Sequence, residues 1–314
     1  MKRRFHGLFA WMMVLVLVLG LIGCGNPDAA KEEKTQAEQK PGASFPVTVQ
    51  DDSGAEVTVE REPKRIVSLI PSTTEIAFSL GIGDRIVGVT TNDNYPPEVE
   101  KIEKVGDINI NVEKVLELKP DLVLASPLNG ETVEKLRSLG LTVLSVDAQS
   151  LEGVYDSIRR VGKATGALKQ AEQLIDEMEK EKEQVVRKVA SIPEEERPKV
   201  WIEVDPTPYT VGGDTFLNEL ITLAGGRNVA AEMKGWPQVS AEQVIKWNPD
   251  VILTTYEKAD KSVASRPGWD RIAAVKAKRI HSLNPDLTTR PGPRVTEGLK
   301  QIAQILYPER FDEN

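Results

Sequence analysis

The chain carries one segment twice, as Val112-Glu-Lys-Val-Leu-Glu-Leu-Lys-Pro-Asp-Leu-Val-Leu-Ala-Ser126 and, 129 residues later, as Ala241-Glu-Gln-Val-Ile-Lys-Trp-Asn-Pro-Asp-Val-Ile-Leu-Thr-Thr255. In each copy a helical pattern ends before Pro-Asp, and a short apolar run typical of a buried strand follows. A weaker echo pairs Glu75–Gly81 with Asn218–Ala224 in the same order. Two matches in one order predict two similar α/β lobes that face each other across a cleft.

The residues before the first copy continue this alternation. The runs 47–50 and 57–60 alternate apolar and polar residues around Asp51-Asp-Ser-Gly54, which predicts a β-hairpin. A buried-strand run follows at Arg65–Ile70, and Ser72-Thr-Thr-Glu75 has the spacing of a capping box that opens a helix. Strands that alternate with helices of this length indicate a parallel sheet.

The pattern changes between Leu151 and Val189, where apolar residues recur at helical spacing over an unusually long stretch. We interpret it as one rigid helix between the lobes. The predicted fold is α/β, with two pseudo-symmetric lobes of mainly parallel sheets joined by one long helix and a ligand cleft between them. The expected boundaries are an N-terminal lobe at 45–155, the inter-lobe helix at 156–190 and a C-terminal lobe at 198–314.

The N-terminus has the features of an export signal. Three basic residues, Lys2 to Arg4, precede an apolar run from Leu8 to Leu21, and Leu21-Ile-Gly-Cys24 resembles the lipobox of bacterial lipoproteins. We therefore expect 1–23 to be a signal peptide and Cys24 to be the site of lipid attachment, with palmitate among its acyl groups. The alternative is an uncleaved anchor helix, for which the apolar run is short.

Residues 24–44 are polar and charged and contain no aromatic residue before the lobe begins. Such a segment buries too little apolar surface to fold, so we expect a disordered tether between lipid and lobe. A short helix through 29–39 would leave that role unchanged.

Composition excludes several classes of function. Removal of Lys2, Arg3 and Arg4 with the signal takes the formal net charge from -8 to -8 - 3 = -11, which disfavours nucleic-acid binding. With Cys24 acylated no thiol remains, and His281 is the one histidine of the mature chain. Motifs of nucleotide-binding loops, zinc proteases and serine hydrolases are missing from the sequence. We expect no enzyme, no metal site and no cofactor.

The region from Lys64 to Tyr307 resembles the periplasmic or lipid-anchored solute-binding proteins of cobalamin and ferric-siderophore ABC importers, in the class with a helical spine. Besides the two repeats, the motifs that carry the resemblance are Arg65-Ile-Val-Ser-Leu-Ile-Pro-Ser-Thr-Thr-Glu75, Gly88-Val-Thr-Thr-Asn-Asp-Asn-Tyr-Pro-Pro97, Gly235-Trp-Pro-Gln-Val-Ser240 and Arg290-Pro-Gly-Pro-Arg294. Within the family the likeness is greatest to the vitamin-B12 binders. The resemblance implies two lobes that hold a ligand in a shallow cleft and deliver it to a membrane permease.

The resemblance also implies a docking role for Glu113 and Glu242. In the family, one glutamate on each lobe contacts arginines of the two permease subunits. Asn111 and Ser240 have the pattern of N-caps, which places both glutamates at the second position of equivalent helices. The alternative is that each acid only favours its helix dipole.

Ligand contacts are expected from residues of both lobes. Trp236 lies in a loop between Gly235 and Pro237, where a binding wall is favoured over a core position. Tyr209 matches a cleft-facing aromatic of the cobalamin binders, with packing under its loop as the alternative. Asn92 and Ser126 stand where those binders carry aromatic residues, which implies a wider or more polar cleft. Ser72 and Arg290 complete the expected set, Arg290 as a grip for an anionic ligand or, like Arg294, as a partner of the protein's own acids.

The sequence thus favours an extracytoplasmic, lipid-anchored binding protein of an ABC importer, active as a monomer and served by a permease dimer with its ATPase subunits. Its ligand is expected to be a corrinoid, with a ferric siderophore second and haem third. A surface-anchored hydrolase and a structural surface lipoprotein are alternatives from other classes of function.

Overall fold

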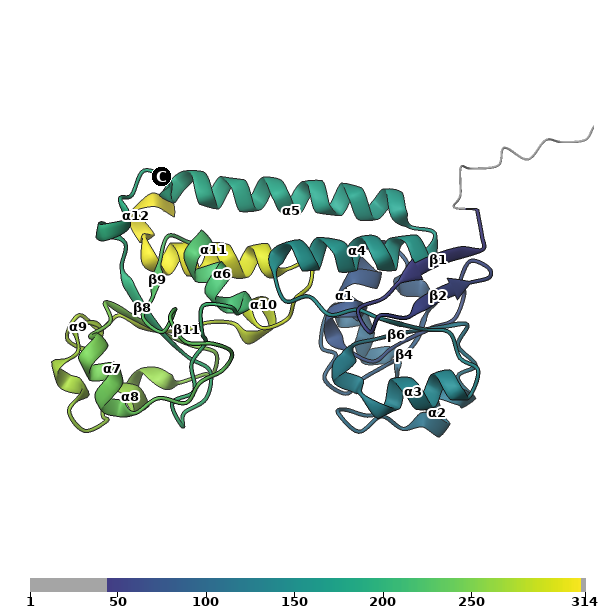
Figure 1. Ribbon diagram of the computed structural model, residues 1–314, viewed down its shortest axis with the longest axis horizontal. Coiled ribbons are helices and arrows are strands. Elements are labelled where there is room, and N and C mark those ends of the chain that lie inside the picture. Colours follow the sequence, from purple (N-terminus) through teal and green to yellow (C-terminus); the bar gives the residue numbers. More distant parts are fainter. Residues whose placement is uncertain (1–43, 312–314) are drawn as a thin grey trace, which may run out of the picture. The chain divides into compact units, whose positions relative to one another are not determined.

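The computed structural model describes residues 44–311 of the chain. The predicted signal peptide at 1–23, the lipid site Cys24 and all but the last residue of the predicted tether at 24–44 lie outside the described residues. Two α/β lobes make up the described part, which we call the N-lobe and the C-lobe (Figure 1). Among residues 44–311 no helix has both the length and the apolar character needed to cross a membrane.

The N-lobe begins with the predicted hairpin. Strands β1 (Val47–Gln50) and β2 (Glu56–Val59) pair antiparallel, with Val47 opposite Val59. A five-stranded parallel sheet follows, with the order β5-β4-β3-β6-β7. Its strands are β3 (Ile66–Ser68), β4 (Ile86–Val89), β5 (Glu103–Lys104), β6 (Leu122–Ala125) and β7 (Val143–Ser145). Its helices are α1 (Pro71–Ser79), α2 (Val112–Glu117) and α3 (Glu131–Ser138).

The C-lobe repeats this order of strands. Its parallel sheet runs β9-β8-β10-β11, which is the N-lobe order without the edge strand β5. The strands are β8 (Lys199–Glu203), β9 (Arg227–Asn228), β10 (Val251–Thr254) and β11 (Ile280–Ser282). The helices are α6 (Phe216–Leu223), α7 (Ala241–Trp247), α8 (Ala259–Ala264), α9 (Ala273–Lys276), α10 (Pro285–Thr288), α11 (Val295–Leu306) and α12 (Pro308–Phe311). The predicted fold of two similar lobes with parallel sheets is confirmed.

The sequence repeat explains this symmetry. At the offset of 129 residues, β6 falls on β10, and each is the strand beside the first parallel strand of its sheet. Both strands are buried along their whole length, as their unbroken apolar pattern requires. Short 3-10 helices fill connections in the two lobes at Gly83–Arg85, Pro97–Lys101, Pro127–Asn129, Glu194–Glu196 and Trp269–Arg271.

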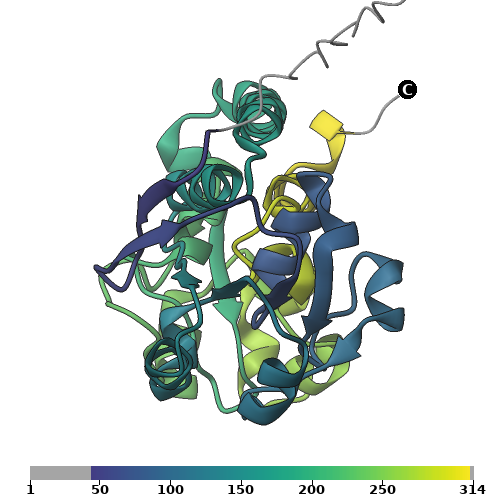
Figure 2. The same ribbon diagram turned by 90° about the vertical axis from the view of Figure 1, so that its right-hand side faces the viewer.

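The segment predicted as one helix at 156–190 consists of two helices. Helix α4 (Leu151–Thr165) ends at Gly166, whose positive φ of 76° reverses the chain, and α5 (Leu168–Val189) runs back beside it. Figure 2 shows the two helices nearly end-on, one above the other and next to the hairpin. Both helices bury an apolar face, so apolar residues recur at helical spacing on both sides of Gly166. For this reason the sequence pattern does not reveal that the helix is broken there. Helix α5 alone bridges the lobes in Figure 1.

One hydrophobic core joins the lobes. It runs from the hairpin residues Val49 and Val57 through α4 and α5 to Leu299 and Ile302 of α11. Separate clusters fill the outer part of each lobe, around Val115 and Val123 in the N-lobe and around Trp201 in the C-lobe. Helix α5 therefore packs against both lobes, and the shared core fixes the lobes relative to each other.

Two of the three predicted N-caps are confirmed. The Asn111 side chain accepts a hydrogen bond from the Lys114 backbone N–H, and the Ser240 side chain accepts one from that of Gln243. The predicted capping box at Ser72 is wrong, because α1 begins at Pro71 and no side chain caps it. Proline suits the first helical position since it has no N–H to leave unbonded. Glu75, the expected acceptor of the box, is instead occupied by arginines of the C-lobe.

Candidate functional site: the cleft between the lobes

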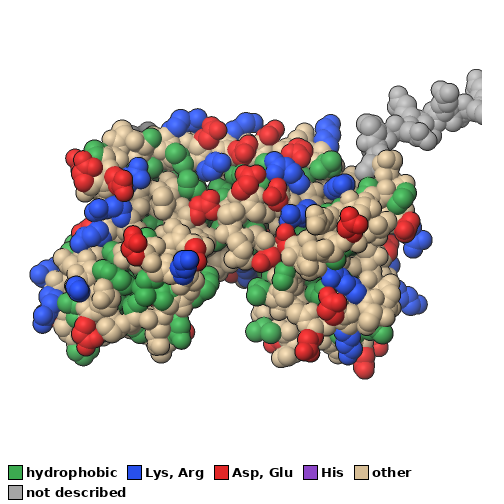
Figure 3. All heavy atoms as spheres, viewed as in Figure 1, with side chains coloured by type: hydrophobic (Ala, Val, Ile, Leu, Met, Phe, Trp, Pro, Cys, Tyr) green, Lys and Arg blue, Asp and Glu red, His purple; other side chains and the backbone are tan. Residues whose placement is uncertain are grey.

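The candidate site lies where the carboxyl ends of the N-lobe strands meet the C-lobe. Ser72 follows β3, Asn92 follows β4 and Ser126 follows β6, each within a few residues of the strand's end. Parallel sheets present their ligand-binding loops at this edge. The space-filling view in Figure 3 shows a notch between the two lobes on the side away from α5.

A pocket of about 130 Å³ brings three of the predicted residues together. Ser72, Ser126 and Arg290 all line it, so that residues from both lobes share one wall. Ile70, Ile76, Val146 and Pro291 make most of its remaining surface apolar, and Leu128 stands 82% exposed among its lining residues. The two serines are themselves almost fully buried. The sequence analysis had predicted all three residues as ligand contacts; the structure brings them to one pocket, and their contact with ligand stays a prediction.

Trp236 and Tyr209 lie on two neighbouring C-lobe loops. Their side chains are 56% and 39% exposed, unlike the core residues Trp201 and Trp269. The loops are held together by backbone hydrogen bonds, in which the Thr210 N–H donates to the Pro237 carbonyl at 2.9 Å and the Val239 N–H donates to that of Pro208 at 3.1 Å. They do not line the pocket of Ser72. The two aromatic rings are thus a separate, solvent-facing apolar surface, and their contact with ligand stays a prediction.

The Tyr209 loop rests on a buried ion pair that sequence reasoning missed. Arg266 donates to both carboxylate oxygens of Glu203, at 2.6 and 2.7 Å, and also to the Pro206 carbonyl at 3.4 Å. Burial and the hydrogen bond with Glu203 raise the pKa of the Tyr256 phenol, which completes the cluster. The Arg266 guanidinium lies 4.6 Å from the ring centre of Trp269 beneath it. These contacts fix the base of the loop.

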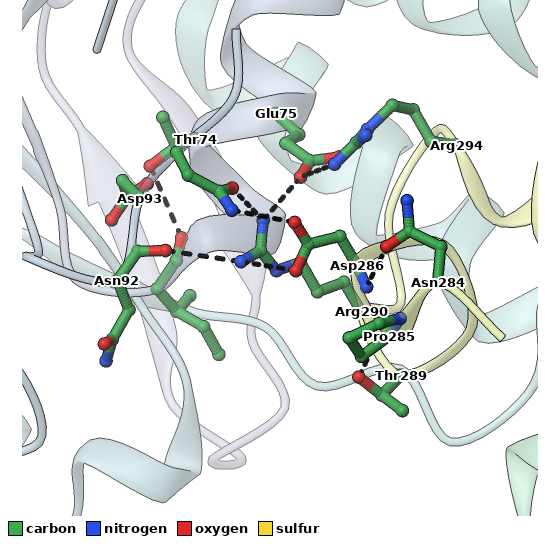
Figure 4. Close-up of polar contacts among 12 residues, drawn as sticks. Thr74, Glu75, Asn92, Asp93, Asn284, Pro285, Asp286, Thr289, Arg290 and Arg294 are labelled. Carbon is green, nitrogen blue, oxygen red and sulfur yellow. Dashed lines mark hydrogen bonds and ion pairs between the residues drawn. The ribbon is translucent and has the colours of Figure 1, made fainter. Parts of the chain in front are cut away.

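Arg290 and Arg294 are bound by acids of the protein itself. Arg294 donates from Nε to Glu75 Oε2 at 2.9 Å and from Nη2 to Oε1 at 2.7 Å (Figure 4). Arg290 donates to Glu75 Oε1 at 3.2 Å and pairs with Asp286 at 2.9 Å. Two arginines and two carboxylates therefore balance in charge. Pairing with the protein's own acids is the alternative that the sequence analysis had left open for Arg294. The Arg290 guanidinium is likewise already bound by Glu75 and Asp286 without any ligand.

Asn92 and its neighbours connect this cluster to β4. The Asn92 carbonyl accepts a hydrogen bond from Arg290 Nη2 at 3.3 Å, and the Asn94 side chain accepts one from Nη1 at 2.7 Å. The Asn92 side chain itself is exposed. Burial raises the pKa of the adjacent Asp93, although hydrogen bonds from Thr74 and Thr90 oppose that shift. The segment thus belongs to the contact between the lobes as well as to the cleft.

Glu113 and Glu242 occupy equivalent places at the predicted second positions of α2 and α7. Both are exposed, and neither forms an ion pair within residues 44–311. Figure 1 shows α2 and α7 in the parts of the two lobes that lie away from the spine. The two carboxylates are therefore exposed groups on equivalent helices, and their contact with a partner stays a prediction.

Ile108 is a second residue that the sequence analysis missed. At the offset of 129, Gly106–Asn111 falls on Gly235–Ser240, and both glycines have positive φ, 120° and 61°. The N-lobe loop equivalent to the Trp236 loop thus presents Ile108, which is 84% exposed. Extending the sequence repeat toward the N-terminus would have found it. Within the described part of the chain, no three His, Cys, Asp or Glu side chains are grouped as metal ligands.

Comparison with known proteins agrees with this architecture. Residues 66–287 match the family model described as periplasmic binding protein. A Bacillus subtilis (strain 168) protein named uncharacterized ABC transporter substrate-binding lipoprotein YvrC is 47% identical over 310 residues, which cover 96% of this chain and 98% of the relative. A cobalamin-binding protein of Halobacterium salinarum is 29% identical, over 96% of this chain and 85% of its own.

A solved structure from Staphylococcus epidermidis, titled a possible iron-binding (periplasmic solute-binding) protein, has a TM-score of 0.71 and 38% identity, and the match covers 79% of this chain and 100% of that one. The chain belongs to the periplasmic binding protein family. Within that family it is a substrate-binding protein of an ABC transporter, a carrier that works with a permease, an ATPase and a small-molecule ligand.

Proposed function

We propose that this protein captures a corrinoid in the cleft between its lobes and delivers it to an ABC permease. The observation that carries the proposal is the charge balance of the cleft wall, where Glu75 and Asp286 neutralise Arg290 and Arg294. A wall with exposed apolar residues and no unpaired arginine suits a large ligand with little net charge. The similarity to a cobalamin-binding protein over nearly the whole chain supports the same ligand class.

A ferric siderophore or haem is the second candidate, in that order. The similarity to the possible iron-binding protein favours it. An anionic ligand of this kind would have to draw Arg290 away from Glu75, since carboxylates bind most strongly to a guanidinium with free N–H groups. A corrinoid with little net charge does not require Arg290 to leave Glu75, whereas an anionic ligand does. The corrinoid is therefore the first choice.

The proposal places the protein on the extracytoplasmic face of the cell membrane. There Cys24 would carry the lipid, and 24–44 would be the tether that lets a monomer reach its transporter. Glu113 and Glu242 would dock one on each permease subunit, because two equivalent anions on similar lobes suit a partner with two-fold symmetry. The name of the Bacillus subtilis relative, a substrate-binding lipoprotein, supports this arrangement.

A thermal-shift screen tests the ligand. The full chain is mixed with cyanocobalamin, cobinamide, several ferric siderophores and haemin, each at a known concentration. A ligand at 100 times its dissociation constant stabilises a folded protein by about 2.7 kcal/mol, which gives a clear rise in melting temperature. We expect the rise with the corrinoids. A rise with a siderophore or haemin alone would replace the corrinoid as ligand.

A further inference from the structure

We infer that the pocket beside Ser72 is a subsite for a primary carboxamide arm of the ligand. The inference rests on the proposed function only in assuming that the ligand occupies the cleft. The volume of the pocket is about 130 Å³, well above the ~10–15 Å³ that one water molecule needs, so the pocket admits a group of several heavy atoms. Residues of both lobes and of α4 enclose it, with Ser157 on the α4 side.

The first half of the subsite is the start of α1, where Pro71 and Ser72 line the pocket and Thr73 follows them directly in the chain. No side chain caps this nine-residue helix, and the backbone N–H groups of Ser72 and Thr73 have no acceptor among the described residues. The hydroxyls of Thr73 and Thr74 turn inward instead, to Ser68 and the Ile70 carbonyl. Unbonded N–H groups at a helix start attract an oxygen acceptor.

The Ser72 side chain points to a ligand independently of the helix. It is only 7% exposed, it lines the pocket, and its hydroxyl has no hydrogen-bond partner among the described residues. The Ser72 oxygen is open to the pocket, whereas the hydroxyl of Ser157 on the α4 side of the same pocket is buried and has no partner among the described residues. A buried hydroxyl without a partner is unfavourable by about 1–3 kcal/mol, so such a group is normally satisfied by something that enters the site. Ser72 adds a side-chain donor next to the helix start, and Ser157 supplies the unsatisfied group that points to a ligand.

The second half of the subsite is an acceptor. Asp147, just beyond the end of β7, lines the same pocket and is half-buried. Its Oδ2 accepts a hydrogen bond from the Gln149 side chain at 2.8 Å, which leaves Oδ1 without a partner among the described residues. A primary carboxamide offers one oxygen to the donors and an NH2 group to this carboxylate.

Charge distinguishes the amide from an acid. A carboxylate arm would meet the donors equally well, but its second oxygen would face Asp147 and be repelled. Arg290 does not offset that repulsion, because Glu75 and Asp286 already engage it. The pocket is thus matched to a neutral arm that carries both a donor and an acceptor.

The test uses acetamide and acetate as probes of the full chain in detergent micelles. The chain is labelled with 15N-threonine, and the Thr73 amide resonance is assigned through Thr73→Ser. We expect acetamide to shift this resonance in a saturable way and to bind several-fold more tightly than acetate. Ser72→Ala should weaken acetamide by about 2- to 10-fold, and Ser72→Thr, which keeps the hydroxyl, should restore most of the affinity.

Asp147→Asn is the decisive variant, since it removes the repulsion and should bring acetate level with acetamide or above it. Asp214→Asn, which changes an exposed C-lobe acid, is the matched control and should leave the preference for acetamide unchanged. No Thr73 shift with either probe, or an acetate affinity equal to that of acetamide in the unmodified chain, would overturn the inference.

Titration of the same samples with cyanocobalamin separates this inference from the proposed function. If the corrinoid does not bind while acetamide still shifts Thr73, the subsite stands and the corrinoid assignment falls. If the corrinoid binds and neither probe shifts Thr73, the subsite falls and the assignment stands.

Discussion

The carboxylate of Glu75 and the guanidinium of Arg294 join the two lobes through two hydrogen bonds, although 219 residues separate them in the chain. Glu75 is 2% exposed and belongs to α1, whereas Arg294 immediately precedes α11. Arg294 also lies over the ring of Tyr95, 3.8 Å from its centre. Charge pairing, ring stacking and the shared core thus hold the lobes in one arrangement.

Glu75→Gln should strongly destabilise the protein. The change keeps the shape of the side chain but leaves Arg290 and Arg294 without their shared carboxylate. Breaking a buried ion pair from one side typically lowers the free energy of unfolding by about 3–5 kcal/mol. Urea unfolding of the variant and of the unmodified chain measures the difference.

Glu62→Gln is the control for that experiment. Glu62 pairs with Lys64 and Arg85, but its side chain is 40% exposed. Exposed ion pairs contribute about 0–1 kcal/mol, so this variant should be nearly neutral. Equal losses in the two variants would show that the Glu75 pair adds nothing beyond a surface contact.

Trp236→Ala should weaken ligand binding by about thirty-fold, or 2 kcal/mol, because a central aromatic side chain in a binding site often contributes that much. Folding stability should change little, since more than half of the side chain is exposed. The comparison variant is Trp269→Ala, which removes a fully buried ring and should lower the free energy of unfolding by about 3–5 kcal/mol. A large stability loss with unchanged affinity in Trp236→Ala would place that ring in the core.

Asp51 makes stability depend on pH. Burial alone would raise the pKa of its carboxyl, but hydrogen bonds from Ser53, Ala55 and Ser145 and the charge of Arg137 outweigh burial and hold the pKa below its usual value. A lowered pKa in the folded state stabilises the protein above the unfolded-state pKa of about 3.9, and that contribution disappears as the pH falls through the folded-state pKa.

Asp51→Asn should therefore reduce the free energy of unfolding by about 1.5–3 kcal/mol at pH 7 and by clearly less at pH 3. Urea unfolding at the two pH values measures this, with the exposed Asp84→Asn as control. A loss of the same size at both pH values would remove the carboxylate's charge from the explanation and leave only the shape of the turn.

Cys24→Ser should release the protein from the membrane fraction and leave its lobes folded, since the core contacts that hold the lobes together are made by residues within 44–311. Fractionation of cells that express either form, together with thermal unfolding of the recovered protein, measures both effects. A variant that stays in the membrane fraction as firmly as the unmodified chain would favour the anchor-helix alternative over lipid attachment.

Local signals in the sequence were sufficient to predict the hairpin, the N-caps at Asn111 and Ser240, and the equivalent strands β6 and β10 of the two lobes. Each of these features depends on neighbours in the chain. The capping box at Ser72 failed because its acid, Glu75, has stronger partners more than 200 residues away. The break between α4 and α5 at Gly166 was not predicted, because the buried apolar residues recur at helical spacing in both helices. The burial of Trp269 beneath Arg266 is likewise a tertiary contact that no local pattern contains.

Simultaneous replacement of Glu113 and Glu242 by alanine should reduce permease binding and uptake while leaving the affinity of the free protein for ligand intact. Both carboxylates are exposed on equivalent helices, and neither lines the Ser72 pocket. Docking of the unmodified protein should weaken as salt is raised, because rim charges are screened, and the double variant should lose part of that salt dependence.

Capture of the permease complex at low and high salt, next to a ligand titration of the free protein, provides the measurement. Glu117→Ala combined with Lys246→Ala is the matched control, since it changes exposed residues at the other ends of the same two helices. Full permease binding by the Glu113/Glu242 variant would exclude the docking role and leave the helix dipole as the reason for these two acids.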